Sequence, residues 1–69
     1  MKYTHSELSK ALETYLLNNE DSNLLDYDVD NVLDDRVLGS VDFEAIDGHG
    51  SWEADFEYNM LTKEIESIG

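Results

Sequence analysis

The sequence contains no cysteine and no proline, and only four of its 69 residues are lysine or arginine. Without cysteine, neither a disulfide framework nor a thiolate metal site is available. No aliphatic run exceeds two residues, whereas a membrane-spanning helix needs about 20, so we expect no spanning segment. The first residues also lack the apolar stretch of a secretory signal. These absences predict a single small domain, residues 1–69, located in the cytoplasm.

Acidic residues are abundant and unevenly distributed. The 17 Asp and Glu residues against four Lys and Arg residues give a net charge of −13. Residues 1–19 are electrically balanced, whereas residues 20–57 carry 13 acids and a single cation, Arg36. Such an excess of negative charge repels nucleic acids and anionic membranes, so we expect direct binding to neither.

The first segment has the pattern of an amphipathic helix. Thr4 and Glu7 have the spacing of a capping box, in which each side chain accepts a hydrogen bond from the other's backbone. We expect the helix to end near residues 18–19, where Asn tolerates the left-handed conformation. Apolar residues follow at helical spacing: Leu8, Ala11, Leu12, Tyr15 and Leu16.

Residues 22–36 fit two patterns. Leu25, Val29 and Leu33 have the spacing of a helical stripe, whereas the alternation of apolar residues with aspartate over 25–30 is typical of a strand. Aspartate favours neither structure. We expect a short helix near 29–35 after an extended approach; in either structure the aspartates point to solvent and the Leu and Val residues point inward.

Residues 37–58 predict a β-hairpin, because apolar and acidic residues alternate along two arms. The loop 47–51 can form a type II′ turn at Gly48-His49 or a type I′ turn at His49-Gly50. The first turn pairs Phe43 with Ala54, and the second pairs Phe43 with Phe56. We expect an inward face of the sheet made of Val41, Phe43, Trp52, Ala54 and Phe56. The outward face would carry Asp42, Glu44, Glu53, Asp55 and Glu57.

These elements predict an α+β fold, in which the N-terminal helix packs on a three-stranded antiparallel sheet. The hairpin supplies two strands, and a C-terminal strand with Ile65 and Ile68 supplies the third. Because these two residues are three positions apart, they share one face only if a bulge intervenes; otherwise the end frays. Phe43, Trp52 and Phe56 should form the core beneath the helix.

No arrangement of residues predicts catalysis, a metal site or a cofactor. A general acid needs a raised pKa and therefore burial or a close partner, whereas these acids occupy outward positions. Asp26, Asp28 and Asp30 have the first three spacings of a calcium loop. The sixth and twelfth positions are Asn31 and Val37, and Val supplies no oxygen ligand. We expect only weak association of cations, and no enzymatic activity.

The acidic surface itself indicates a function. Like charges on neighbouring strands destabilise a sheet, so their retention favours a role in binding a basic surface. The predicted partner is a basic nucleic-acid-binding protein or complex. The predicted partner-binding residues are Asp26, Asp28, Asp30, Asp34, Asp35, Asp42, Glu44, Glu53, Asp55 and Glu57. The acids outside residues 20–57 should matter less: Glu7, Glu13, Glu64 and Glu66.

In its size, its lack of cysteine and the clustering of acids over residues 20–57, the chain resembles the small acidic phage-type inhibitors that act as DNA mimics, including anti-CRISPR and anti-restriction proteins. The resemblance implies a stoichiometric inhibitor that acts in the host cytoplasm, with a CRISPR effector, a restriction enzyme or a nuclease as its partner. Two alternatives remain open. One is an immunity protein or antitoxin that masks a basic nuclease or toxin. The other is an acidic domain of the kind found in salt-adapted organisms, with no special partner.

Overall fold

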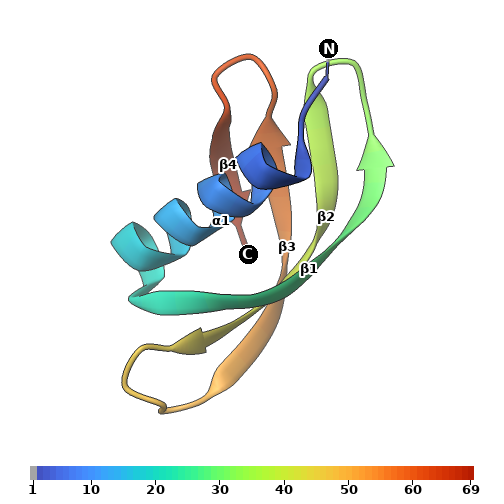
Figure 1. Ribbon diagram of the computed structural model, residues 1–69. Helices are drawn as coiled ribbons and strands as arrows, with labels where there is room; N and C mark the ends of the chain where they lie inside the picture. Colours follow the sequence, from blue (N-terminus) through green and yellow to red (C-terminus); the bar gives the residue numbers. More distant parts are fainter. Residues whose placement is uncertain (1) are drawn as a thin grey trace.

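The computed structural model describes residues 2–69, which form one helix packed against a four-stranded antiparallel sheet. The strands lie in the order β1-β2-β3-β4, so each pairs with its neighbour in the chain. The predicted α+β class is confirmed, but the sheet has four strands rather than three, and residues 2–69 contain no second helix. Figure 1 shows the elements: α1 (His5–Glu20), β1 (Ser22–Val32), β2 (Arg36–Ala45), β3 (Ser51–Asn59) and β4 (Glu64–Ile68).

Helix α1 begins at the predicted capping box. The Glu7 N–H donates to the Thr4 hydroxyl at 3.0 Å, and the Thr4 N–H donates to the Glu7 carboxylate at 3.1 Å. The helix ends at Glu20, slightly later than predicted. Its C-cap is Asp21, whose left-handed conformation (φ 47°) lets the Asp21 N–H donate to the Leu16 carbonyl. Within residues 2–69, no helix combines the length and apolar content that crossing a bilayer requires.

The predicted short helix near residues 29–35 does not form, because β1 continues through Val32. A helix there would stack Asp26, Asp30 and Asp34 four residues apart, where like charges repel. The extended chain instead pairs with β2 along most of its length. This pairing gives hydrogen-bond partners to backbone N–H and C=O groups that would lack them in a short isolated helix.

Two β-bulges interrupt β1, the first at Leu25. This extra residue lets Leu24 and Tyr27, three positions apart, both pair with buried residues of β2. The inward orientation predicted for Leu25 is therefore wrong, and its side chain is 52% exposed. Val29 and Val32 pair with inward-facing residues of β2 but remain 37% and 49% exposed.

The β2–β3 hairpin has the predicted alternation but neither predicted register. Phe43 pairs with Trp52. The loop comprises residues 46–49 and is closed by a hydrogen bond of 2.9 Å from the Ala45 N–H to the Gly50 carbonyl. Relative to the two predicted registers, this loop moves the partner of Phe43 by two or four positions. Because both shifts are even, the residues predicted to face inward still share the inner face.

Strand β4 contains the bulge that the spacing of its isoleucines predicts. Tyr58 pairs with Ile65 and Phe56 pairs with Ile68, with a register shift between them. Ile65 is buried, and Ile68 packs partly buried against the core. The prediction that a bulge lets both isoleucines share one face is thus confirmed.

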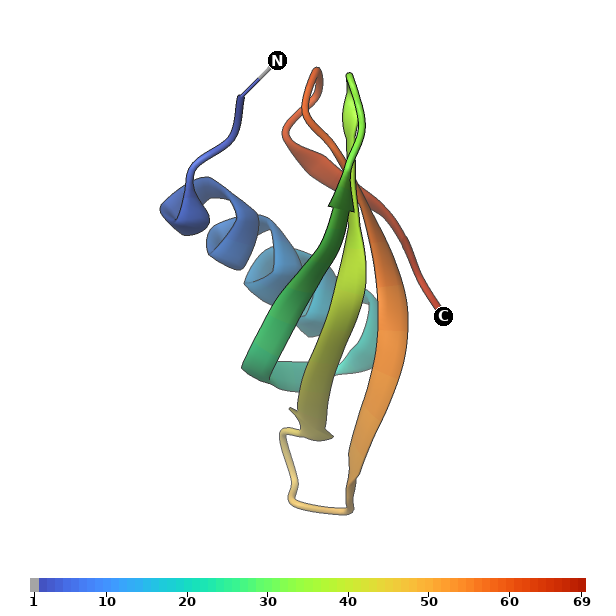
Figure 2. The ribbon, with the colours of Figure 1, turned by 90° about the vertical axis from the view of Figure 1, so that its right-hand side faces the viewer.

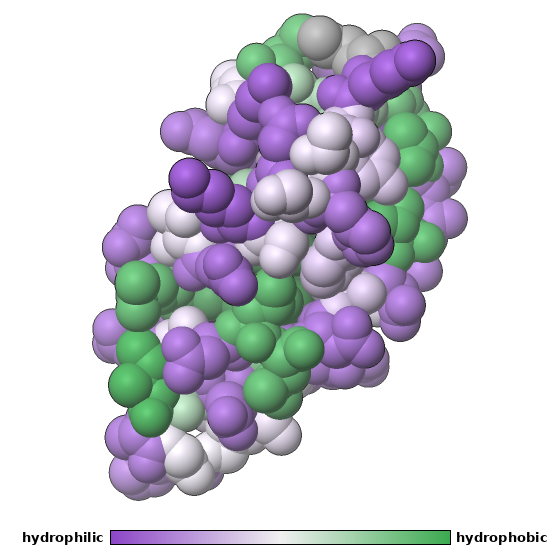
Figure 3. Space-filling view, in the orientation of Figure 1, coloured by the Kyte–Doolittle hydropathy of each residue, from purple (hydrophilic) through white to green (hydrophobic). Residues whose placement is uncertain are grey.

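The core lies between α1 and the inner face of the sheet. Trp52, predicted to be in the core, is instead 51% exposed. The β2–β3 hairpin extends past α1, so the helix does not cover its far end (Figures 1 and 2). There the Trp52 ring packs against Phe43, with ring centroids 6.0 Å apart. Figure 3 shows apolar surface below α1 on this side. The buried apolar residues are Leu8, Leu12, Leu16, Val37, Val41, Phe43, Phe56, Tyr58, Met60 and Ile65.

Replacing two aromatic residues of β3 tests this placement. Phe56→Ala should lower the free energy of unfolding by about 3–5 kcal/mol, because it leaves a cavity in the core. Trp52→Ala should cost about 1 kcal/mol, because half of the ring already faces solvent. Urea denaturation followed by circular dichroism measures both. Equal losses would contradict the position of α1 described above.

Candidate functional site

The outer face of the sheet, which faces away from α1, presents alternate residues of β1, β2 and β3. Figure 2 shows α1 on one side of the sheet only. The acids predicted on the hairpin lie on the outer face, as their alternation with core residues requires, and two acids of β1 join them. Together these residues are termed the acidic face: Asp26, Asp28, Asp42, Glu44, Glu53, Asp55 and Glu57.

The strand register aligns these carboxylates in rows across the sheet. Asp42 pairs with Asp26 on one side and with Glu53 on the other, so three carboxylates form one row. In the next row, Asp28 and Asp55 flank a serine of β2. Directly paired residues have Cβ atoms only about 4.5–5.5 Å apart, where like charges are destabilising.

The charge density of the acidic face is comparable to that of DNA. Three adjacent rows carry six carboxylates. They cover roughly 13 Å along the strands and roughly 10 Å across them. A duplex carries about eight charges over 13 Å of its axis, of which about half face one side. The acidic face therefore presents at least as much negative charge as one side of a duplex of equal length.

Arg36 marks one end of the acidic face. Its guanidinium lies 3.0 Å from Glu57, 3.1 Å from Asp35 and 3.7 Å from Glu66. The hydrogen bond to Glu57 is the main reason that the pKa of Arg36 is raised. The sequence prediction assigned Arg36 no role, although it is the sole cation of residues 20–57. Within residues 2–69, the six other acids of the face form no ion pair.

Three of the predicted partner-binding residues lie outside the acidic face. Asp30 is the extra residue of the second bulge in β1 and has no partner in β2. Asp34 is exposed in the connection between β1 and β2, and Asp35, beside it, pairs with Arg36. The structure thus brings seven of the ten predicted residues together and places the other three at the border of the sheet.

Two acids predicted to matter less have partners of their own. Glu7 binds Lys63 at 2.7 Å. The hydrogen bond from Lys63, followed by that from Thr4, lowers the pKa of Glu7. Glu66 is shared between Arg36 and Asn59, whose amide donates to it at 2.7 Å.

The two histidines and the acids of the described residues do not assemble into a metal centre. His5 contacts the Tyr27 hydroxyl at the start of α1, and His49 lies 2.8 Å from Asp47 at the exposed hairpin tip. Over residues 2–69, no group of three or more His, Asp or Glu side chains is arranged to hold a metal ion. Asp26 and Asp28 lie on an extended strand rather than on a loop that could wrap a cation.

Repulsion within the acidic face should lower the free energy of unfolding by a measurable amount. Asp42→Asn removes the central charge of the row and should raise the free energy of unfolding by about 1 kcal/mol at low ionic strength. The thermal midpoint of the unmodified protein should rise with sodium chloride, and less so in the variant, because salt screens the same repulsion. Glu13→Gln, on the exposed side of α1, is the control. A thermal midpoint that does not change with salt would contradict the presence of this repulsion among the acids of the acidic face.

Comparisons with known proteins give no functional assignment. No protein-family model matches the chain, and neither a curated protein nor a solved structure matches it. The functional argument therefore depends on the composition and geometry of the surface, of which the acidic face is the most distinctive part.

Proposed function

We propose that this protein is a stoichiometric inhibitor that presents its acidic face in place of DNA. It would occupy the nucleic-acid-binding site of a host defence complex of the anti-CRISPR or anti-restriction type. The observation that carries this proposal is the row Asp26–Asp42–Glu53, in which three directly paired carboxylates cross the sheet without an ion-pair partner among residues 2–69.

Stability alone does not explain such a row. A lysine in place of Asp42 would convert two repulsive cross-strand pairs into attractive ones. A salt-adapted surface would distribute acids over the whole molecule, whereas residues 1–19 carry equal numbers of acidic and basic residues. The alignment of seven acids on one face of the sheet, at a cost in stability, is typical of a surface selected for binding.

The chemistry of the acidic face supports a partner with a basic surface. A patch of roughly 13 by 10 Å with six uncompensated carboxylates fits a channel lined with Lys and Arg side chains. Complementary charges raise the association rate and make it sensitive to salt. Because the carboxylates project from hydrogen-bonded strands, their backbone positions are fixed before binding, which lowers the entropic cost of association.

Competition with DNA tests the proposal. Purified CRISPR effectors and restriction enzymes are incubated with labelled duplex DNA and increasing amounts of the protein, and retention of DNA is measured by gel shift. For a complex that this protein inhibits, DNA binding should be lost near equimolar protein. Simultaneous binding of protein and DNA without loss of DNA affinity would contradict mimicry, as would failure to bind any complex of such a panel.

A charge-matched pair of variants separates the acidic face from net charge. Asp42→Lys with Asp55→Lys should abolish inhibition and raise thermal stability, because it relieves repulsion on the acidic face. Glu13→Lys with Glu20→Lys makes the same change in net charge on exposed positions of α1 and should leave inhibition nearly intact. Equal effects of the two pairs would show that net charge, rather than this face, is recognised.

A further inference from the structure

The far end of the β2–β3 hairpin, residues 43–54, carries exposed apolar side chains. Figure 2 shows this segment, here termed the hairpin end, projecting past α1 and the start of β1. Ile46 is 54% exposed and Trp52 is 51% exposed. Apolar surface gathered at one place on a small protein commonly marks a contact with another molecule.

The Trp52 ring is held in place by its neighbours on the hairpin end. It packs against Phe43 with an angle of 32° between the ring planes. The ring also lies close to Gly50, where an added Cβ would be 3.7 Å from Trp52 Cζ2. Because these contacts already order the indole, a partner that covers it incurs little further loss of side-chain entropy. Tryptophan residues in such positions are typical anchors of protein interfaces.

The surroundings of these apolar groups are acidic. Neither residues 43–54 nor residues 17–25, at the junction of α1 and β1, include a Lys or Arg. The two segments are in contact, since the Ile46 N–H donates to the Asp21 carbonyl at 3.0 Å. Their acids are Glu20, Asp21, Glu44, Asp47 and Glu53. A complementary partner therefore presents basic side chains around an apolar centre.

A second copy of this chain does not have this chemistry. It would bring the same five acids to the contact, and each copy carries a net charge of −13. Charges of one sign on both sides oppose association, and an anionic membrane is repelled for the same reason. Charge complementarity thus favours a basic protein over either of these occupants.

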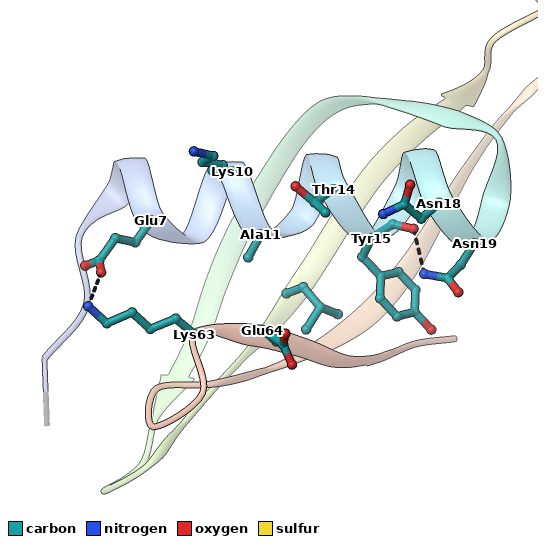
Figure 4. Close-up of a pocket in the computed structure, with 10 residues that line it drawn as sticks. Glu7, Lys10, Ala11, Thr14, Tyr15, Asn18, Asn19, Lys63 and Glu64 are labelled. Atoms are coloured by element: carbon teal, nitrogen blue, oxygen red, sulfur yellow. Dashed lines mark hydrogen bonds and ion pairs between the residues drawn. The ribbon is translucent and has the colours of Figure 1, made fainter.

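A pocket between α1 and β4 differs from the hairpin end in its charge. It has a volume of about 420 Å³ and is lined by two acids and two cations. Figure 4 shows Glu7 bound to Lys63 at one end of the pocket, with Lys10 on α1 and Glu64 on β4. Because these charges balance, the pocket selects neither a basic nor an acidic partner.

We propose that the hairpin end is the apolar anchor of the partner interface, with Trp52 at its centre. This inference rests on the proposed function and specifies the partner site: Lys and Arg side chains surround aromatic or apolar side chains that contact bases in the nucleic-acid complex. Many nucleic-acid sites combine basic groups for phosphates with stacking aromatics or apolar wedges for bases. Glu44 and Glu53 of the acidic face adjoin Phe43 and Trp52 in the chain, so one partner reaches both. The carboxylates replace phosphates, and the indole replaces a base.

Competition with labelled DNA at several salt concentrations tests the anchor, with a complex that the unmodified protein inhibits. Trp52→Ala should weaken inhibition by about tenfold or more at every salt concentration, because salt screens charges but not apolar contacts. Ile46→Ser, in the exposed loop, should weaken it by about threefold. Asp42→Lys with Asp55→Lys should instead reduce the dependence of inhibition on salt. Leu61→Ala is the matched control, since Leu61 is 62% exposed in the β3–β4 turn, and it should leave inhibition unchanged.

A fluorescent label gives a direct measure of contact at the same position. Trp52 is the sole tryptophan, so incorporation of 5-hydroxytryptophan labels this residue alone and permits excitation apart from the partner's tryptophans. Acrylamide should quench the label severalfold less in the complex than in the free protein. Inhibition with the label still fully quenched, or equal inhibition by Trp52→Ala, would overturn the anchor and leave the proposed function intact. Failure of the unmodified protein to inhibit any complex would overturn both. Self-association in sedimentation experiments that Trp52→Ala abolishes would assign the hairpin end to a second copy and likewise overturn the anchor.

Discussion

Burial of the leucine stripe of α1 against the inner face of the sheet holds this structure together. Leu8, Leu12 and Leu16 are fully buried, and each fully buried leucine contributes about 1.5–3 kcal/mol. One repulsive cross-strand pair costs less than about 1 kcal/mol. The hydrophobic contact therefore outweighs the repulsion that the acidic face introduces. Because side chains alternate along a strand, each residue that packs inward against the helix places its neighbours on the outer face. This alternation puts the acids on one face.

The elements with local periodicity could be predicted from the sequence. The capping box of α1, its leucine stripe and the alternation along β2 and β3 all depend on residues close in the chain. The strand at 22–32 could not be predicted, because its aspartates oppose both regular structures and only pairing with β2 decides between them. The exposure of Trp52 depends on how far the hairpin extends past α1, a tertiary property that alternation does not encode.

The candidate site was predictable to a similar extent. The hairpin acids follow from their alternation with Phe43 and Phe56, and an even shift of register leaves them on the same face. Asp26 and Asp28 were among the predicted binding residues, but their alignment with the acids of the hairpin was not predicted, because it depends on the pairing of β1 with β2. The pocket between α1 and β4 has no signature in the sequence, because its two walls belong to elements at opposite ends of the chain.

The sequential strand order also affects how this chain folds. Each strand pairs with the one that precedes or follows it, so the sheet requires only short loops to close. Short closures cost little chain entropy, and topologies rich in such contacts fold quickly. Each hairpin can form as soon as its two arms are available, without waiting for a distant segment. A chain of 69 residues built in this way should therefore reach its native state in few steps, in spite of the repulsion among its 17 acids.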